Sequence, residues 1–370
     1  MPEKKATVYY ADLRTTTRRN LLDKIDDLIA AVDAGGRFKK GHLVAVKMHF
    51  GEKGNTSFIQ PVFVRRVVER IKETGAEPFL TDTNTLYMGT RGNSVSHLRT
   101  AYENGFAYAV IGAPVIIGDG LRGELGVKVP VDGKHFKEVD LAGEIVNASG
   151  LVVLTHFKCH EMTGFGGAIK NVGMGCASRE GKLAQHSNCA PLVDPSGCTA
   201  CSECADHCPV DAIDVGKVAV IDPKVCIGCG HCIAACPEST INIQWNETTS
   251  NLQEKIVEYA SALLKPKAGK TIYINFVTRV SPACDCYGHN DSPIVRDIGI
   301  LASTDIVAID KASADMVNNE VGLPDTALKS GHGPGKDKFR GVYPTVDWTI
   351  QLDCAQAAGL GTKNYKLEKI

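Results

Sequence analysis

Residues 150–155, GLVVLT, are an apolar run that leads directly into HFKCHEMTGFGGAIKN, residues 156–171. A short continuous apolar run is typical of a strand that is buried on both faces, as strands are in parallel sheets. Residues just beyond the carboxyl end of such a strand lie where open α/β sheets place ligands. The stretch therefore predicts a buried strand followed by a candidate site. The alternative is a glycine-rich turn with incidental polar residues.

The segments around this strand alternate between helix and strand patterns. Helical spacing of apolar residues covers 15–36, 61–77, 95–105 and 140–150, and strand patterns cover 42–50, 78–83, 113–119, 151–157 and 271–280. Residues 297–322 again give a strand and then a helix. This alternation predicts an α/β fold, in which a mostly parallel sheet is covered by helices on both faces.

Polar residues recur where the predicted strands end. They are Lys47, His49, Asp82, Asn84, His156 and Lys158. The carboxyl ends of parallel strands meet at one edge of the sheet, so repetition over several strands predicts a shared cleft. The chain has no phosphate-binding loop and no good dinucleotide fingerprint after a strand.

Two cysteine runs carry the strongest motif in the chain. CTACSECADHCP (198–209) and CIGCGHCIAACP (226–237) both follow C-x2-C-x2-C-x3-C-P. They resemble the runs of bacterial two-cluster ferredoxins, in which the fourth cysteine binds the other cluster. The resemblance implies one [4Fe–4S] cluster on Cys198, Cys201, Cys204 and Cys236, and a second on Cys226, Cys229, Cys232 and Cys208.

Zinc is the alternative occupant of these cysteines. Zinc motifs usually combine two separated pairs of ligands, so two runs of four cysteines closed by proline fit clusters better. A thioredoxin-like motif would need one C-x-x-C near a βαβ unit. Residues 210–225 between the runs supply a short hairpin. We therefore expect residues 188–245 to form a small α+β ferredoxin-like domain, inserted into one discontinuous α/β domain of residues 1–187 and 246–370.

The composition of the chain indicates where the protein is found and which partners it does not bind. The formal net charge is −1, which gives no field to gather nucleic acid or anionic lipid. The first residues lack a signal-peptide core, and no apolar run approaches the roughly 18 residues of a membrane span. We expect a soluble cytoplasmic protein, where most of the 14 cysteines serve as metal ligands because disulfides are rare.

Other cysteines lie outside the two runs. Cys284, Cys286 and His289 lie close together in CDCYGH (284–289). A metal or redox site and a pair of loop thiols without function both fit this spacing. Because such closeness alone is a weak metal signal, we favour the second interpretation. Cys354, in a helical pattern, is expected to be a small buried hydrophobe.

The whole chain resembles the DUF362 family of iron–sulfur proteins. The resemblance rests on KMHFG (47–51), residues 156–175, the double cysteine motif and ILASTDIVAIDKAS (300–313). Little chemistry is established for that family, so the resemblance supports the architecture more than a reaction.

Residues 156–186 are similar to a motif of the nickel-pincer lactate racemase family. The residues that fit it are His156, His160, Gly164, Gly167 and Lys170, with Ala168 in place of a glycine. The similarity implies that Lys170 carries a covalent cofactor, that His186 binds a metal and that His160 is an acid or base. The Pro-Gly that follows the lysine in that family is absent here, and the racemases carry no ferredoxin unit. The match suggests a shared site and not the same reaction.

These observations define one candidate site. We expect Lys170, His160 and His156 to act in catalysis, because a desolvated lysine and a histidine suit nucleophilic and proton-transfer chemistry. We expect the cofactor-binding residues to be Lys47, Asp82, Lys158, Asn171 and His186. A further metal or a small organic cofactor near Lys170, or an anionic small molecule, would suit this set. In the alternative, Lys170 is a solvated lysine at a helix start.

Three functions fit the two parts. The first is an oxidoreductase that passes electrons from two [4Fe–4S] clusters to a substrate or cofactor beside Lys170. The second is an electron-transfer or binding subunit without chemistry of its own, and the third is a metal-handling or cofactor-maturation protein. The expected partner is a redox partner protein or a small electron donor. The strand-end cluster favours the first, since a pure carrier needs no such cleft.

Overall fold

An eight-stranded sheet forms the centre of the computed structural model, which describes residues 5–87, 89–187 and 189–370. Its strands are β1 (Ala6–Asp12), β2 (Leu43–Lys47), β3 (Glu77–Asp82), β4 (Val115–Ile117), β7 (Gly150–His156), β14 (Thr271–Val277), β15 (Gly299–Ser303) and β16 (Tyr365–Lys369). They lie in the order β16-β1-β15-β14-β7-β2-β3-β4. β15 pairs antiparallel with β1 and β14, and the other pairings are parallel. The mostly parallel sheet is confirmed.

Strand β7 occupies the middle of the sheet, and every one of its residues is buried. Its side chains alternate between two apolar cores. Leu151 and Val153 belong to one core, and Val152 and Leu154 belong to the other. A strand covered on both faces needs apolar residues at every position, which explains the uninterrupted run GLVVLT.

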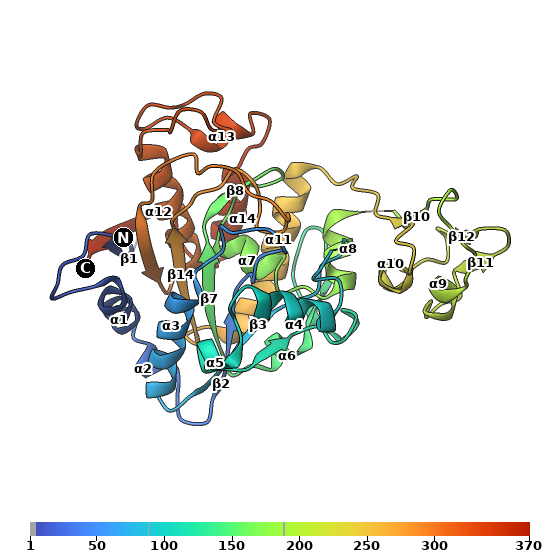
Figure 1. Ribbon diagram of the computed structural model, residues 1–370, viewed down its shortest axis with the longest axis horizontal. Helices are drawn as coiled ribbons and strands as arrows, with labels where there is room; N and C mark the ends of the chain where they lie inside the picture. Colours follow the sequence, from blue (N-terminus) through green and yellow to red (C-terminus); the bar gives the residue numbers. More distant parts are fainter. Residues whose placement is uncertain (1–4, 88, 188) are drawn as a thin grey trace.

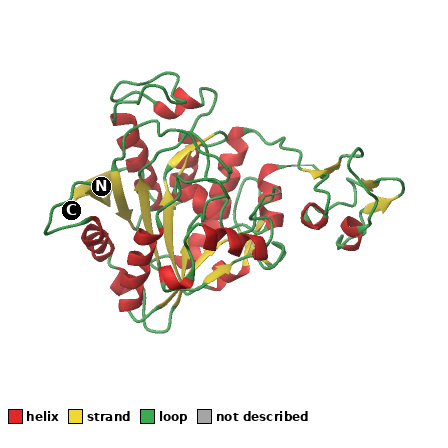
Figure 2. Ribbon diagram, in the orientation of Figure 1, coloured by secondary structure: helices red, strands yellow, loops and turns green. Residues whose placement is uncertain are grey.

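Helices cover both faces of the sheet, as predicted (Figures 1 and 2). Buried residues on one face come from α1 (Leu21–Ala31), α3 (Pro61–Glu73), α4 (Ser94–Glu103) and α5 (Tyr108–Ile111). Those on the other face come from α6 (Gly143–Asn147), α7 (Ala168–Gly173), α11 (Thr249–Leu264), α12 (Ile306–Asn319) and α14 (Thr349–Ala357). The two cores lie on opposite sides of the strands, which is the layered arrangement expected of this class.

Local signals explain most helix boundaries. The side chain of Asn20 accepts hydrogen bonds from the amides of Leu22 and Asp23, and the side chain of Asp23 accepts one from the amide of Asn20. This capping box makes Asn20 the N-cap, so α1 begins at Leu21. The expected start at the preceding threonines is therefore wrong. Pro61 stands in the first turn of α3, where its missing amide hydrogen costs nothing.

The helix expected over residues 140–150 is wrong in its first part. Residues Glu138–Ala142 form β6, which pairs antiparallel with β5 (Gly126–Pro130), and only the short α6 follows. Val139 and Leu141 are both buried and two residues apart, which is the period of a strand. The segment was too short for the two periods to be told apart from sequence.

Two strands at one end of the sheet, the edge strand β16 and its neighbour β1, were not predicted from the sequence. β1 and β16 come from opposite ends of the chain and lie side by side in the sheet (Figure 1). Most residues of β16 are exposed, so the strand lacks the apolar run that marks a buried one. Within the described residues, none of the helices combines the length and apolar character needed to cross a membrane.

Residues 189–245 project to one side of the sheet domain in Figure 1, and we call them the small lobe. Its elements are β10 (Leu192–Val193), α9 (Glu203–Asp206), β11 (Ile213–Val215), β12 (Ala219–Ile221), α10 (His231–Ala235) and β13 (Ile241–Asn242). β11 and β12 form the hairpin expected between the cysteine runs. A separate apolar cluster joins the lobe to Leu86 and Leu183 of the sheet domain. In the chain, the lobe follows α8 (Arg179–His186) and is followed by α11.

Candidate functional site

A cavity of about 620 Å³ opens at the carboxyl ends of β2, β3 and β7. Its walls include all eight residues predicted for the site: Lys47, Asp82, His156, Lys158, His160, Lys170, Asn171 and His186. Cavities of this size are typical of small-molecule sites. The structure thus brings together residues that are up to 139 positions apart in the sequence, from Lys47 to His186.

The parallel strands deliver three of these side chains. Lys47, Asp82 and His156 are the last residues of β2, β3 and β7, which are neighbours in the sheet. His49 follows β2 and also lines the cavity. Asn84, the remaining residue expected at a strand end, does not line it. Its backbone amide and side-chain amide each donate to Asp119 at 3.0 Å, so it is fully buried beside the cavity.

The segment after β7 folds into a hairpin and a short helix. Lys158–His160 (β8) pairs antiparallel with Gly164–Gly166 (β9), and α7 follows at Ala168. Gly164 has a φ of +73°, and a Cβ there would lie 2.4 Å from the Cβ of Trp348. A glycine is therefore required at this turn. The hairpin places Lys158 and His160 in the cavity wall, and α7 adds Lys170 and Asn171.

The first backbone amides of α7 are bound by an acidic side chain of α12. The Asp310 carboxylate accepts hydrogen bonds from the amides of Ala168 (2.7 Å) and Ile169 (2.9 Å). These two amides are therefore not available to a ligand of the cavity, because a side chain of α12 already occupies them. Burial raises the pKa of Asp310 to about 6 despite these bonds.

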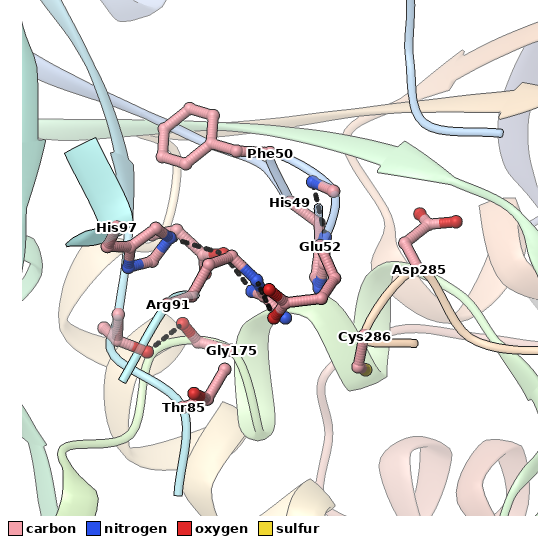
Figure 3. A network of polar contacts seen from close by, with 12 residues as sticks. His49, Phe50, Glu52, Thr85, Arg91, His97, Gly175, Asp285 and Cys286 are labelled. Atoms are coloured by element: carbon pink, nitrogen blue, oxygen red, sulfur yellow. Dashed lines mark hydrogen bonds and ion pairs between the residues drawn. The ribbon is translucent and has the colours of Figure 1, made fainter. Parts of the chain in front are cut away.

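A buried charge network forms one wall of the site. Lys47 Nζ lies 3.0 Å from Asp82 Oδ1 and donates to Asn171 Oδ1 at 2.7 Å. Arg91 connects Asp82 (3.4 Å) to Glu52 (3.2 Å), and Figure 3 shows Arg91 facing Glu52. Burial alone would raise the pKa of Asp82, but Lys47 and the neighbouring cations outweigh it and hold that pKa well below its usual range. This wall is fixed by complementary charges.

A second network is centred on Asp285, which is completely buried. His156 Nδ1 lies 2.9 Å from both carboxylate oxygens, and Lys158 Nζ lies 3.0 Å from Oδ2. His156 Nε2 lies 3.0 Å from the carbonyl oxygen of Thr278. Both ring nitrogens of His156 thus face acceptors and are already used. The geometry suits a residue that positions the site better than one that accepts a proton from a substrate.

Lys170 differs from the other lysines of the cavity. Within the described part of the chain, its ammonium has no hydrogen-bond or ion-pair partner. Burial is the main cause that lowers its pKa to about 8, and the positive charge of Lys158 adds to the effect. A substantial fraction of such a lysine is neutral near physiological pH, and a neutral amine is a nucleophile and a base.

Two neutral histidines accompany this lysine. Burial and the charge of Lys170 hold the pKa of His160 well below its ordinary value, and the same causes lower that of His186 to about 3. His160 Nδ1 accepts from the amide of Met162 at 3.2 Å, which leaves Nε2 as its remaining site, 3.7 Å from Glu161. A neutral imidazole with a remaining ring nitrogen can exchange a proton with a ligand.

Several residues of the candidate site were not found from the sequence. Asp285, Glu52 and Arg91 come from loops far apart in the chain, and only the fold brings them to the site. Trp245, at the end of the small lobe, also lines the cavity and packs edge-on against His186 with ring centroids 4.8 Å apart. The sequence offered one usable signal, which was the acidic residue enclosed in CDC.

Cys284 and Cys286 form a disulfide, and both line the cavity. His289 is exposed and contacts Tyr287 at a ring distance of 5.5 Å. The three residues therefore do not converge on one point. Cys354 is half-buried in α14 and not fully buried as expected.

The cysteines of the small lobe form two groups. Cys198, Cys201, Cys204 and Cys236 line one small cavity, and Cys208, Cys226, Cys229 and Cys232 line another. All eight are free thiols. Within the described ranges, no three His, Cys, Asp or Glu side chains lie close enough together to hold a single metal ion.

Comparisons with known proteins give one family match and similar solved structures. The model of a family described as a domain of unknown function, DUF362, matches residues 44–315. The lactate racemase apoprotein from Thermoanaerobacterium thermosaccharolyticum is similar, with 14% identity, a TM-score of 0.37 and coverage of 74% of this chain and 51% of that chain. A protein from Thermotoga maritima shows 11% identity and a TM-score of 0.35, over 70% of this chain and 50% of that chain. The chain spans about half the length of both. No curated protein matches it.

Proposed function

We propose an iron–sulfur redox function for this chain, which belongs to the DUF362 family, a family of unknown function. The match confirms the membership that the sequence predicted. In our proposal the small lobe holds two [4Fe–4S] clusters, and the cavity beside Lys170 binds a small anionic substrate or cofactor that receives electrons. When bound, such clusters supply single electrons at potentials set by their surroundings.

The grouping of the cysteines carries this proposal. Each small cavity is lined by three thiols of one run and the fourth thiol of the other run. This crossing is the ligand pattern of two-cluster ferredoxins. Polar groups also reach the sulfur atoms: the amide of Ala212 donates to Cys208 at 3.2 Å, and that of Ala219 donates to Cys198 at 3.4 Å. Hydrogen bonds of this kind stabilise thiolates and tune cluster potentials.

The contact between the lobe and the sheet domain supports electron delivery to the cavity. Leu86 lines the cavity and also packs in the apolar cluster that contains Cys232. A Cβ on Gly230, between Cys229 and Cys232, would lie 3.6 Å from Leu86 Cδ1. The loop that carries Cys229 and Cys232 thus lies next to a residue of the cavity wall at Gly230. We assign the delivery of electrons to the group that contains these two cysteines, and contact with an external donor to the group that contains the exposed Cys201.

The chain's own residues suit a small anion in the cavity. Lys47 and Lys158 are neutralised by Asp82 and Asp285, whereas the amine of Lys170 has no partner among the residues that the structure describes. A carboxylate or phosphate would pair with Lys170 and stabilise its charged form, since an opposite charge raises the pKa of a lysine. The neutral His160 would then exchange a proton with the ligand as electrons arrive.

Anaerobic reconstitution with iron and sulfide tests the proposal. We expect about eight irons and eight sulfides per chain, and a broad visible absorbance that a low-potential reductant bleaches. Lys170→Ala should keep this absorbance and lose binding of a small anion such as phosphate. Lys39→Ala, at an exposed lysine remote from the cavity lining, is the matched control. Zinc in place of iron, without visible absorbance, would contradict the proposal.

A further inference from the structure

The disulfide between Cys284 and Cys286 lies in the wall of the cavity that contains Lys170 and His160. It encloses only one residue, Asp285. A disulfide restricts the unfolded chain less as the closed loop becomes shorter, so a bridge of this span contributes little stabilisation. A structural role therefore does not explain why the pair is here.

The loop is also held in place without the disulfide. The buried Asp285 carboxylate is bound by His156 and Lys158. The carbonyl oxygen of Asp285 accepts from the amide of Glu52 at 3.0 Å. The carbonyl oxygen of Cys286 accepts from the hydroxyl of Tyr87 at 3.0 Å. These bonds do not involve sulfur, so the loop can keep its position when the S–S bond opens.

We propose that Cys284 and Cys286 are a redox-active pair that collects two electrons for the ligand of this cavity. The proposal rests on the proposed function for its electron source, which is a one-electron iron–sulfur donor. Two such transfers reduce the pair. The S–S bond breaks, two electrons enter, and two protons from water form the thiols of Cys284 and Cys286. Oxidation of the pair by a bound two-electron acceptor passes both electrons to that acceptor, releases the two thiol protons to the acceptor or to water, and re-forms the S–S bond.

The position of the pair fits this exchange. A thiolate is the reactive form of cysteine, and nearby cations favour it. Lys170 lines the same cavity as the pair, whereas Lys158 offsets the charge of Asp285 between the two cysteines. Each cluster gives one electron at a time, whereas a dithiol gives two electrons together to a ligand that accepts them in pairs. The pair supplies such a dithiol at the place where the ligand binds, and Tyr87 and Leu86 line the same cavity between the pair's loop and the lobe contact.

Equilibration in dithiol–disulfide buffers of graded ratio tests the redox activity of the pair directly. After acid quenching and alkylation in denaturant, mass spectrometry of the peptide with residues 284 and 286 gives the reduced fraction. We expect a single two-electron transition within the range of the buffers. Cys354→Ser, which changes a cysteine outside the cavity lining, should leave the transition unchanged. A pair that stays oxidised, or stays reduced, at every ratio in the folded protein would overturn the proposal.

A second measurement separates this proposal from the proposed function. Reduced methyl viologen serves as the one-electron donor, and the same alkylation follows the pair over time. We expect the reconstituted protein to reduce the pair at least tenfold faster than Cys229→Ser, which lacks a ligand of the nearer group. If the pair titrates in dithiol buffers but methyl viologen reduces it at equal rates in the reconstituted protein and in Cys229→Ser, the iron–sulfur source would be refuted. Assembled clusters with a pair that never titrates would refute the pair and leave the proposed function standing.

Discussion

Lys47 and Asp82 end adjacent parallel strands and form an ion pair of 3.0 Å in which both side chains are buried. The same ammonium donates to Asn171, whose own amide donates to the carbonyl oxygen of Leu154 in β7. One lysine thus connects three strands to the helix that carries Lys170. Because α7 is only six residues long, the bonds of Asn171 to this wall also fix the position of its neighbour Lys170.

Removing one partner of this pair should destabilise the protein strongly. We expect Lys47→Met to lower the free energy of unfolding by about 3–5 kcal/mol, because it leaves the Asp82 carboxylate buried with less compensation. Urea unfolding, followed by circular dichroism, measures the effect. The control is Lys137→Met, which breaks an exposed pair with Asp132 and should cause no measurable change. Equal midpoints for the two variants would show that the buried pair is not needed.

The crossed grouping of the cysteines makes a sharp prediction for Cys208. Cys208→Ser should damage the cluster proposed on Cys226, Cys229 and Cys232, and it should spare the one nearer Cys198. Iron analysis and electron paramagnetic resonance of the reduced, reconstituted protein would show one remaining cluster. Cys236→Ser should instead damage the cluster nearer Cys198 and spare the one proposed on Cys226, Cys229 and Cys232. If each serine variant lost the cluster of its own run, the two ligand sets would not be crossed.

The lowered pKa of Lys170 predicts its reactivity. Modification by an amine-directed reagent requires the neutral amine, so its rate should rise with a midpoint near the pKa of about 8. Ordinary lysines should rise near about 10.4. Peptide mapping over a pH series separates Lys170 from an exposed lysine such as Lys39. A midpoint for Lys170 equal to that of Lys39 would mean that the cavity does not desolvate its amine.

The same shift affects stability, with a definite sign. Between the folded-state pKa of about 8 and the unfolded value of about 10.4, the unfolded chain binds more protons at Lys170, so this residue makes stability rise with pH. Below a pH of about 8, the buried charged amine lowers the free energy of unfolding by its full amount. Lys170→Met should therefore be more stable than the unchanged protein at pH 7, and the difference should shrink as pH approaches 10. A difference that grows with pH would contradict the assignment.

The sequence predicted the parts of the site that follow from single strands. An unbroken apolar run marks β7, and the polar residues at the ends of β2, β3 and β7 converge because the strands are parallel. The hairpin of the small lobe also followed from local pattern. The cap on α7 did not, because Asp310 is 142 residues from Ala168 in the chain. Long-range pairing of this kind leaves no local pattern.

The same limit explains the missed half of the cavity. Asp285 is recognisable only after β14 has been placed beside β7, which brings the CDC loop to His156. Glu52 and Arg91 lie in loops whose sequences carry no period. The error over residues 140–150 has a different origin, since a short segment with two buried positions fits a strand and a helix equally well.

The last prediction concerns the independence of the sheet domain. Deletion of residues 188–245 with a short glycine–serine linker should leave a folded remainder, because the cores on both faces of the sheet contain no residue of the small lobe. The cost should be local, since the deletion uncovers Leu86 and Leu183. Leu86→Ser with Leu183→Ser in the deleted protein should improve its solubility without changing its thermal midpoint by more than a few degrees. Circular dichroism should retain the helix and strand signals, and unfolding should remain cooperative. Aggregation of every linker length, with and without the serine changes, would show that the sheet domain needs the lobe in order to fold.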